Sequence, residues 1–253
     1  MTRMSAKHKK MSELRIGNVT SKNEYILARM AGFADLPCRY LCSKMGAGTV
    51  CMEMISATAL TYKNEKTFEM LKIHPEESTV SLQLFGKDPD TLAEAARMID
   101  EYPFRILDVN MGCPVKKIVD NGEGSALMKD PLLIGRIVEA LVKATKKPVT
   151  IKIRSGFDAN HINAVEVAHI AEECGASAVT VHGRTRTEFY EGTADYDIIR
   201  QVKESVKIPV IGSGDVCDIE SAMKMKRETG VDGINEFACC WSKIESLPSM
   251  ILA

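Results

Sequence analysis

The chain of 253 residues lacks an apolar run approaching the ~20 residues that a membrane-spanning helix needs. Residues 1–13 are basic and polar and lack the apolar core of a secretory signal. The formal net charge is −1, so the molecule as a whole has no electrostatic footprint for nucleic acid, and any such attraction must come from local patches. We therefore expect a cytoplasmic protein without membrane association, in which residues 1–13 form a flexible basic tail.

The eight cysteines include no C-x-x-C pair and show no spacing with histidine that is typical of a metal site. Their distribution favours reduced thiols in a cytoplasmic protein. We expect no metal.

Hydrophobic residues make up 45% of the chain and charged residues 26%, which allows a complete core. Short apolar or β-branched runs recur along the sequence and predict strands near Tyr25–Arg29, Thr49–Met52, Thr79–Leu84, Ile106–Val109, Val149–Lys152, Ala178–Val181, Pro209–Ile211 and Gly233–Ile234.

Amphipathic segments lie between these runs, and their ends carry helix signals. One begins at Asp88-Pro89, and another at Asp130-Pro131. The second is expected to bury Ile134, Ile137, Val138, Leu141 and Val142. A third ends at Gly175.

Eight alternations of strand and helix predict an α/β protein in which residues 14–253 form one (β/α)8 TIM barrel. An open, doubly wound sheet is the alternative. It is less favoured because no G-x-G-x-x-G follows the first strand.

The most informative segment runs from Leu107 to Pro131. An apolar strand leads directly into Asn110, Gly112, Cys113 and Pro114, so a thiol lies on a tight turn just beyond the carboxyl end of a strand. Reacting groups occur at this place in parallel α/β proteins. The alternative is that Cys113 is a small buried hydrophobic residue.

Other polar residues also follow strand ends. Lys152 and Arg154 fall on one side of their strand. Two cations that point into a barrel mouth would need an anion as partner, and the alternative is a solvated pair at the strand end. Gln83 lies in an otherwise apolar strand and needs hydrogen-bond partners, either a ligand or a neighbouring strand.

The loops of the same face carry basic residues and a small flexible turn. The basic residues could meet RNA phosphates or form a solvated cluster; they are Lys116, Lys117, Arg184 and Arg186. The turn Gly212-Ser213-Gly214-Asp215 would let backbone N–H groups approach a phosphate.

The segment Asp108–Pro131, with Asn-Met-Gly-Cys-Pro and Gly-x-Gly-Ser-Ala-Leu-Met, resembles the tRNA-dihydrouridine synthase family. Ile16-Gly-Asn-Val19 and Met30–Pro37 resemble the start of that family, nearest its bacterial B-type branch. The resemblance covers roughly residues 14 to 234. It implies an FMN-binding barrel that uses NADPH to reduce the C5=C6 bond of a uridine in tRNA.

The resemblance also implies roles for particular residues. Cys113 would donate a proton to C5, and Asn110 would hold the uracil edge. Arg154 would contact the substrate or its phosphates, while His182 would contact flavin or substrate. The residues implied to bind FMN are Ala28, Arg29, Met30, Gln83, Lys152, His182, Ser213, Gly214 and Asp215.

The sequence departs from the family pattern at three places. Arg29 stands where the family has proline, beside the expected flavin ring. Residues 235–241 lack the Gly-Arg pair that binds the FMN phosphate, and Glu236 would repel a phosphate. The sequence ends at Ala253, before the helical domain that the family usually adds. The last strand–helix unit is therefore expected to be atypical.

Two alternative functions stay open at this point. One is an FMN barrel that acts on a free pyrimidine, as dihydroorotate dehydrogenases do. The other is a truncated relative without catalytic activity.

Overall fold

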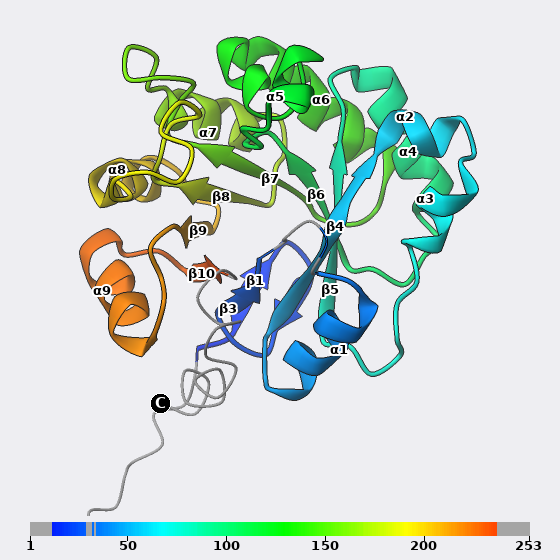
Figure 1. Cartoon of the computed structure of the whole chain (residues 1–253), viewed down its shortest axis with the longest axis horizontal. Coiled ribbons are helices and arrows are strands. Elements are labelled where there is room, and N and C mark those ends of the chain that lie inside the picture. The colour runs from blue at the N-terminus through cyan, green and yellow to red at the C-terminus, as the bar shows by residue number, and fades with distance from the viewer. Residues whose placement is uncertain (1–11, 29–31, 33, 237–253) are drawn as a thin grey trace, which may run out of the picture.

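A computed structural model describes residues 12–28, 32 and 34–236. Eight parallel strands close into a barrel in the order β10-β3-β4-β5-β6-β7-β8-β9 (Figure 1). Their bounds are β3 Tyr25–Leu27, β4 Thr49–Ser56, β5 Thr79–Phe85, β6 Ile106–Asn110, β7 Val149–Arg154, β8 Ala178–His182, β9 Val210–Ser213 and β10 Gly233–Glu236. The predicted TIM barrel is confirmed, and all eight predicted strands are present with ends shifted by a few residues.

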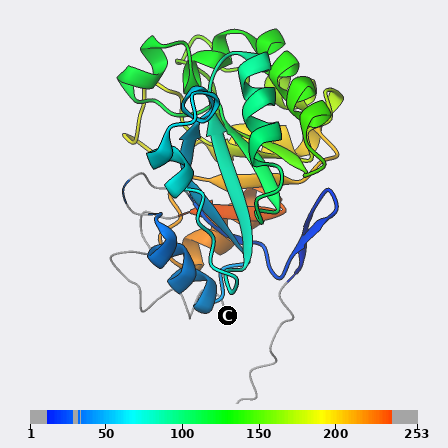
Figure 2. The same ribbon diagram turned by 90° about the vertical axis from the view of Figure 1, so that its right-hand side faces the viewer.

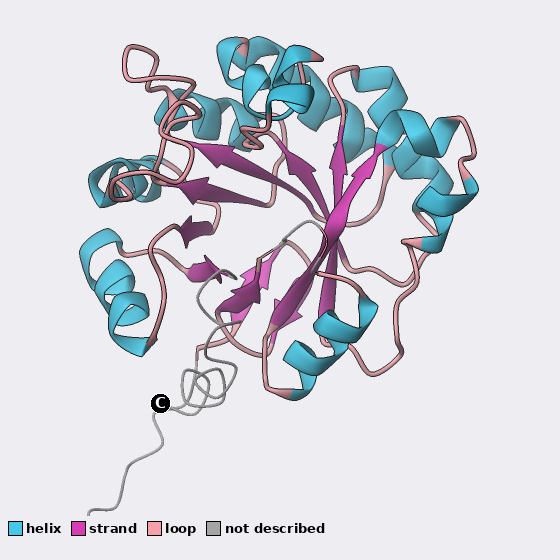
Figure 3. Ribbon diagram, in the orientation of Figure 1, coloured by secondary structure: helices cyan, strands magenta, loops and turns pink. Residues whose placement is uncertain are grey.

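Helices connect successive strands on the outside of the barrel (Figure 3). They are α1 Leu36–Lys44, α2 Ala57–Thr61, α3 Glu65–Glu69, α4 Pro89–Ile99, α5 Lys116–Asp120, the 3₁₀ helix η1 Gly124–Lys129, α6 Pro131–Ala144, α7 Ala164–Glu173, α8 Tyr196–Ser205 and α9 Ile219–Thr229. Apolar side chains of these helices pack against the outward-facing residues of the strands, such as Leu107, Val109 and Ile151.

Aspartate followed by proline sets the start of several helices. The carboxylates of Asp35, Asp88 and Asp130 each accept a backbone N–H of the first turn, and each helix carries a proline at its first or second position. The carboxylate accepts an N–H group that has no partner within the helix, and the proline ring holds φ near its helical value. Together they fix the residue at which the helix starts.

The expectation that Val142 is buried in α6 is wrong. Its side chain is 38% exposed, whereas Ile134, Ile137, Val138 and Leu141 are fully buried. Successive residues of an α-helix are turned by about 100°, so the position after Leu141 has left the apolar stripe.

A hairpin that sequence reasoning missed precedes the barrel. Strands β1 (Leu14–Ile16) and β2 (Val19–Ser21) pair antiparallel around Gly17, whose φ of 56° suits a tight turn (Figure 2). Its apolar side forms one buried cluster with residues near the amino ends of the barrel strands. The cluster consists of Leu14, Ile16, Val19, Ile26, Cys51, Ile106, Ala178 and Ile211. The hairpin thus closes the amino end of the barrel.

The carboxyl half of the barrel interior is polar instead. Its walls include Gln83, Asp108, Thr150 and Thr180, above a cavity of about 20 Å³ that the apolar cluster closes from below. Such a volume holds about one water molecule. The apolar floor and the polar upper half direct the chemistry to the carboxyl ends of the strands.

Candidate functional site

Strand register brings the predicted site residues to one end of the barrel. Gln83 of β5 pairs in register with Asp108 of β6, and Asn110 pairs with Lys152 of β7. Arg154 pairs with His182 of β8, which in turn pairs with Ser213 of β9. Residues far apart in the sequence therefore form two adjacent layers at the carboxyl ends of the strands.

Cys113 lies on a turn held by hydrogen bonds on both sides. Asn110 Oδ1 accepts the backbone N–H of Cys113 at 2.9 Å and that of Gly112 at 3.3 Å. On the other side, the hydroxyl and the backbone N–H of Ser125 donate to the Cys113 carbonyl, at 2.9 and 3.1 Å. The position of the thiol is therefore fixed by the backbone of its own turn.

Gly124 lets this turn approach closely. Its φ is 58°, and a Cβ there would lie 2.9 Å from the Cys113 carbonyl oxygen and 3.0 Å from the Cys113 Cβ. A side chain at this position would displace the thiol. This explains why a glycine follows the cysteine turn at this spacing.

A chain of buried polar side chains connects the barrel interior to this turn. Asp108 Oδ2 accepts Gln83 Nε2–H at 2.5 Å, and Asp108 Oδ1 accepts the Thr150 hydroxyl at 2.5 Å. Gln83 Oε1 then accepts from Asn110 Nδ2 at 2.8 Å. Gln83 is thus bonded to a neighbouring strand, which is one of the two kinds of partner that its sequence position predicted.

Lys152 lines the cavity together with Gln83 and Asp108. Its ammonium donates to Ser213 Oγ at 3.3 Å, and the residue is partly exposed. A lysine at this point places a positive charge against any group bound over the barrel mouth.

Arg154 is 3% exposed and its guanidinium is held by backbone carbonyls. Nε donates to Gly112 O at 3.0 Å, and Nη1 donates to Thr185 O and Phe189 O at 2.7 and 2.8 Å. Burial lowers the pKa of this guanidinium, while Tyr190 and then Cys113 act in the opposite direction. The carbonyls supply the negative partner that the sequence led us to seek in a bound anion.

The same side chain locates the cysteine turn. Arg154 Nε donates to the carbonyl of Gly112, the residue before Cys113, at 3.0 Å. Since Arg154 ends β7, the Cys113 turn lies against the carboxyl end of that strand, at the barrel mouth.

His182 is a buried, neutral imidazole. Burial, followed by the positive charges of Lys152, Arg154 and Arg184, lowers its pKa to about 2. The ring is 9% exposed and lies 3.5 Å from Arg184 Nη1 through Nε2. At neutral pH it can exchange hydrogen bonds with a ligand, but it carries no proton for transfer as an imidazolium.

Arg184 and Asp215 differ from the expectation of free phosphate-binding groups. Arg184 is 4% exposed, and its Nη2 pairs with Asp215 Oδ1 at 2.7 Å. Further N–H groups of Arg184 donate to the carbonyls of Glu191 and Gly192, and Asp215 Oδ2 accepts the Ala194 N–H at 2.5 Å. Together the pair fastens residues 191–194 to the turn after β9.

Gly214 shapes that turn beside His182. Its φ is 112°, and a Cβ there would lie 2.8 Å from His182 Cδ2 and 2.9 Å from Nε2. The turn can therefore pack on the imidazole only because residue 214 has no side chain.

The remaining basic residues are more accessible. Lys116 is 82% exposed and pairs with Asp120 at 2.7 Å, and Lys117 is also exposed. Arg186 lies over the Phe157 ring, with its guanidinium carbon 5.5 Å from the centroid. The two lysines keep N–H groups available to solvent at the carboxyl-end face, whereas Arg186 is half-buried and its Nε is buried without a hydrogen-bond partner among the described residues.

Some predicted positions fall outside the described residues. Ala28 is described and buried just beyond β3, whereas Arg29 and Met30 are not described. Asn235 and Glu236 pair through their backbones with β3, which continues the barrel. The altered segment from residue 237 onward and most of the predicted basic tail (residues 1–11) also lie outside the described part.

Sequence reasoning missed Asp108 and Thr150 as members of the site. A signal was present, because period-two alternation in Ile106–Asn110 places Asp108 on the same face as Asn110. A carboxylate inside a buried strand must be hydrogen-bonded, and the facing hydroxyl of Thr150 lies on the next strand.

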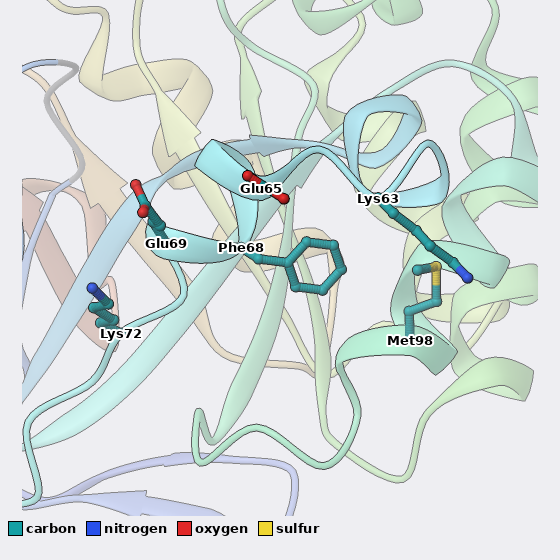
Figure 4. Close-up of a pocket in the computed structure, with 6 residues that line it drawn as sticks. All are labelled: Lys63, Glu65, Phe68, Glu69, Lys72 and Met98. Atoms are coloured by element: carbon teal, nitrogen blue, oxygen red, sulfur yellow. The ribbon is translucent and has the colours of Figure 1, made fainter.

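A second hollow lies outside the barrel, between α3 and α4 (Figure 4). It has a volume of about 470 Å³ and is lined by Lys63, Glu65, Phe68, Glu69, Lys72 and Met98. None of the predicted site residues lines it, so it contributes nothing to the site at the barrel mouth.

The described residues contain no cluster of three or more His, Cys, Asp or Glu side chains suited to a metal ion. None of their helices combines the length and apolarity that crossing a bilayer requires.

Comparison with known proteins finds the same family that the sequence around Cys113 resembles. The family model described as "Dihydrouridine synthase (Dus)" matches residues 26–236. A probable tRNA-dihydrouridine synthase of Rickettsia conorii is 45% identical over 222 residues, covering 87% of this chain and 67% of the relative. The tRNA-dihydrouridine synthase B of Pseudomonas aeruginosa is 44% identical over 224 residues, covering 88% and 68%.

Two solved structures share the fold at low sequence identity. The 6-hydroxypseudooxynicotine amine oxidase of Pseudomonas geniculata N1 matches with a TM-score of 0.70 and 14% identity, over 96% of this chain and 50% of its own. Histamine dehydrogenase of Rhizobium sp. 4-9 has a TM-score of 0.70 and 15% identity, over 93% and 47%. The chain thus spans about two thirds of these sequence relatives and about half of these structures.

Proposed function

Because the chain belongs to the dihydrouridine synthase family, we propose that it reduces the C5=C6 bond of a uridine in tRNA to 5,6-dihydrouridine. The observation that carries the proposal is the Cys113 turn, held at the barrel mouth by Asn110 and, through the Gly112 carbonyl, by Arg154. The proposal extends to FMN as cofactor, NADPH as reductant and the cytoplasm as location.

The residues at the mouth fit a flavin ring. Lys152 of β7 and Gln83 of β5 stand on either side of β6 beneath the mouth, and an ammonium and an amide can both donate hydrogen bonds to the edge of a ring bound above them. We assign both to the ring, with the ammonium of Lys152 placed to stabilise its reduced, anionic form. Ala28 would adjoin the ring, and Arg29 and Met30 stay proposed neighbours.

The phosphate of the cofactor would lie at the turn after β9. Gly214 has no side chain to block an approach, and Ser213 offers a hydroxyl. Asp215 is better suited to fixing this turn, since its carboxylate is bonded to Arg184 and Ala194 and would repel a phosphate.

When bound, FMN supplies the hydride that adds to C6 of the uracil. Cys113 donates its Sγ–H proton to C5, which completes reduction of the double bond and leaves a thiolate that regains a proton from solvent. A thiol suits this role because Sγ–H is a proton donor that a side chain can hold within reach of the reacting carbon. His182 would contact the ligands as a neutral ring, because its pKa is about 2.

Asn110 would hold the uracil edge with the Nδ2–H that Gln83 does not use. The RNA backbone would be met by the exposed Lys116 and Lys117 and by the half-buried Arg186, since phosphate contacts supply sequence-independent affinity. Arg154 and Arg184 serve mainly to hold the backbone of the mouth. A target base must leave its stack to reach Cys113, which favours a loop nucleotide.

The proposal is tested by expressing the chain in a strain that lacks its own dihydrouridine synthases. Nucleoside mass spectrometry should find dihydrouridine in its tRNA, and the purified protein should carry one FMN per chain. Cys113→Ala should keep the flavin and lose about 10²- to 10⁴-fold of the rate on tRNA. A protein that binds no flavin, or that reduces free uracil in preference to tRNA, would refute the proposal.

A further inference from the structure

The polar chain from the barrel interior to the cysteine turn has a fixed direction. Asp108 accepts hydrogen bonds at both carboxyl oxygens, from Gln83 and Thr150, and the backbone N–H of Cys113 can only donate one. Between these ends stand two side-chain amides, Gln83 and Asn110, each of which has one accepting and one donating end. Both amides satisfy all three contacts in one orientation only.

Each link sets the next one. Because Asp108 accepts, Gln83 must present its NH2 to it at 2.5 Å and turn Oε1 toward Asn110. Asn110 must then donate Nδ2–H to Gln83 at 2.8 Å, which leaves its Oδ1 for the N–H of Cys113 at 2.9 Å. All four residues are buried, so water cannot readily replace a lost contact.

We propose that Asp108 is a positioning residue: it fixes the orientation of Gln83 and Asn110 and, through Asn110, the placement of the Cys113 turn. The proposal rests on the proposed function, in which Cys113 is the proton donor and Asn110 holds the uracil. Asp108 acts on Asn110 through Gln83, which is bonded to both.

Loss of the acceptor is expected to release the whole chain. In Asp108→Leu, which keeps the branching at Cγ, Gln83 Nε2 has lost its acceptor and both amides can rotate. Asp108→Asn should rescue the function, because its Oδ1 can still accept from Gln83 while its NH2 donates to the Thr150 hydroxyl, which is able to accept. The pair of variants separates the need for an acceptor from the need for a charge.

The control is Thr180→Val. Thr180 lines the same cavity from β8 and is buried, but it is not a member of the hydrogen-bonded chain. The substitution therefore removes a polar group of similar burial without changing the orientation of Gln83 or Asn110.

The experiment uses the purified flavin-bound full chain and follows the two half-reactions separately. Asp108→Leu should slow flavin reoxidation by tRNA about 10- to 100-fold and flavin reduction by NADPH clearly less, because reduction involves Gln83 at the flavin ring but neither Asn110 nor Cys113. Asp108→Asn and Thr180→Val should reoxidise near the wild-type rate. Added to Asn110→Ala, Asp108→Leu should cause little further loss, since it acts through Asn110.

A second readout does not depend on turnover. Alkylation of Cys113 by iodoacetamide, followed by peptide mass spectrometry, should be several times faster in Asp108→Leu than in the wild type, whereas alkylation of the exposed Cys217 should not change. If Asp108→Leu does not fold, the double variant Asp108→Asn with Thr150→Val replaces it. In this double variant the NH2 of Asn at position 108 has no hydroxyl at position 150 to donate to. It can turn toward Gln83, where a donor now replaces the acceptor, so the double variant should show the same loss as Asp108→Leu.

The outcomes separate the two proposals. A wild-type protein that is inactive on tRNA would refute the proposed function, while the alkylation rates would still test the positioning role. If the wild type is active on tRNA, two results would overturn the role of Asp108 and leave the proposed function standing. One is an Asp108→Leu variant whose flavin is reoxidised at the wild-type rate. The other is a loss of rate in Asp108→Leu that adds fully to the loss in Asn110→Ala. Equal slowing of both half-reactions would also overturn it, since that result indicates a general structural defect.

Discussion

Acidification should destabilise this barrel through one residue, His182. Its imidazole is 9% exposed, and burial together with Lys152, Arg154 and Arg184 lowers its pKa to about 2 in the folded protein. In the unfolded chain the pKa returns to about 6.5. Above that pH the ring is neutral in both states, so its contribution to stability is fully present.

Below about pH 6.5 only the unfolded state takes up the proton, so stability is lost as the pH falls toward the folded pKa. Each pH unit in this window corresponds to about 1.4 kcal/mol. Between about pH 8 and pH 5, His182 alone should therefore remove about 2 kcal/mol from the free energy of unfolding. For a chain of this length that is a fall in Tm of about 4–8 °C.

The assay is urea or thermal unfolding of the wild type and His182→Asn at about pH 8 and pH 5. The variant should be less stable at the higher pH, since it loses buried contacts, but its further loss on acidification should be smaller than that of the wild type by about 2 kcal/mol. His169→Gln is the control, because its imidazole is exposed on the outer helix α7. It should keep the wild-type response. Equal acid losses in the wild type and His182→Asn would refute the reasoning.

Three further predictions concern stability. Gly214→Ala combines a φ of 112° with a Cβ 2.8 Å from an imidazole carbon, so it should lower Tm and loosen the turn after β9, as measured by calorimetry and hydrogen exchange. Asp88→Ala removes the N-cap of α4 and should lower the unfolding free energy in urea by about 1 kcal/mol, whereas the neighbouring Asp90→Ala should change it less. Arg39→Leu leaves the fully buried Glu77 carboxylate without its partner and should lower the free energy of unfolding by about 3–5 kcal/mol; a change below about 1 kcal/mol would contradict this.

The barrel itself could be predicted from the sequence because its signals are local. Period-two and apolar runs define strands, and aspartate–proline pairs define helix starts, each within a few residues. The rule that reacting groups follow strand ends then placed Gln83, Cys113 and Lys152 at one mouth, where the structure also has them. The hairpin Leu14–Ser21 was missed because each of its strands has only 3 residues, too few for a period to be seen.

Only the tertiary structure decided how each polar group is used. In the sequence, Arg154, Arg184 and Lys116 are all basic residues predicted near strand ends. In the structure, the guanidinium groups of the two arginines are hydrogen-bonded to backbone carbonyls and to Asp215, whereas the side chain of Lys116 is exposed to solvent. Whether a side chain is available or already bonded depends on strands and loops that lie far away in the chain, and sequence spacing does not contain that information. The sequence determined which residues reach the barrel mouth, and the closure of the barrel decided which of them remain available there, because each buried donor must find its acceptor on a neighbouring strand or loop.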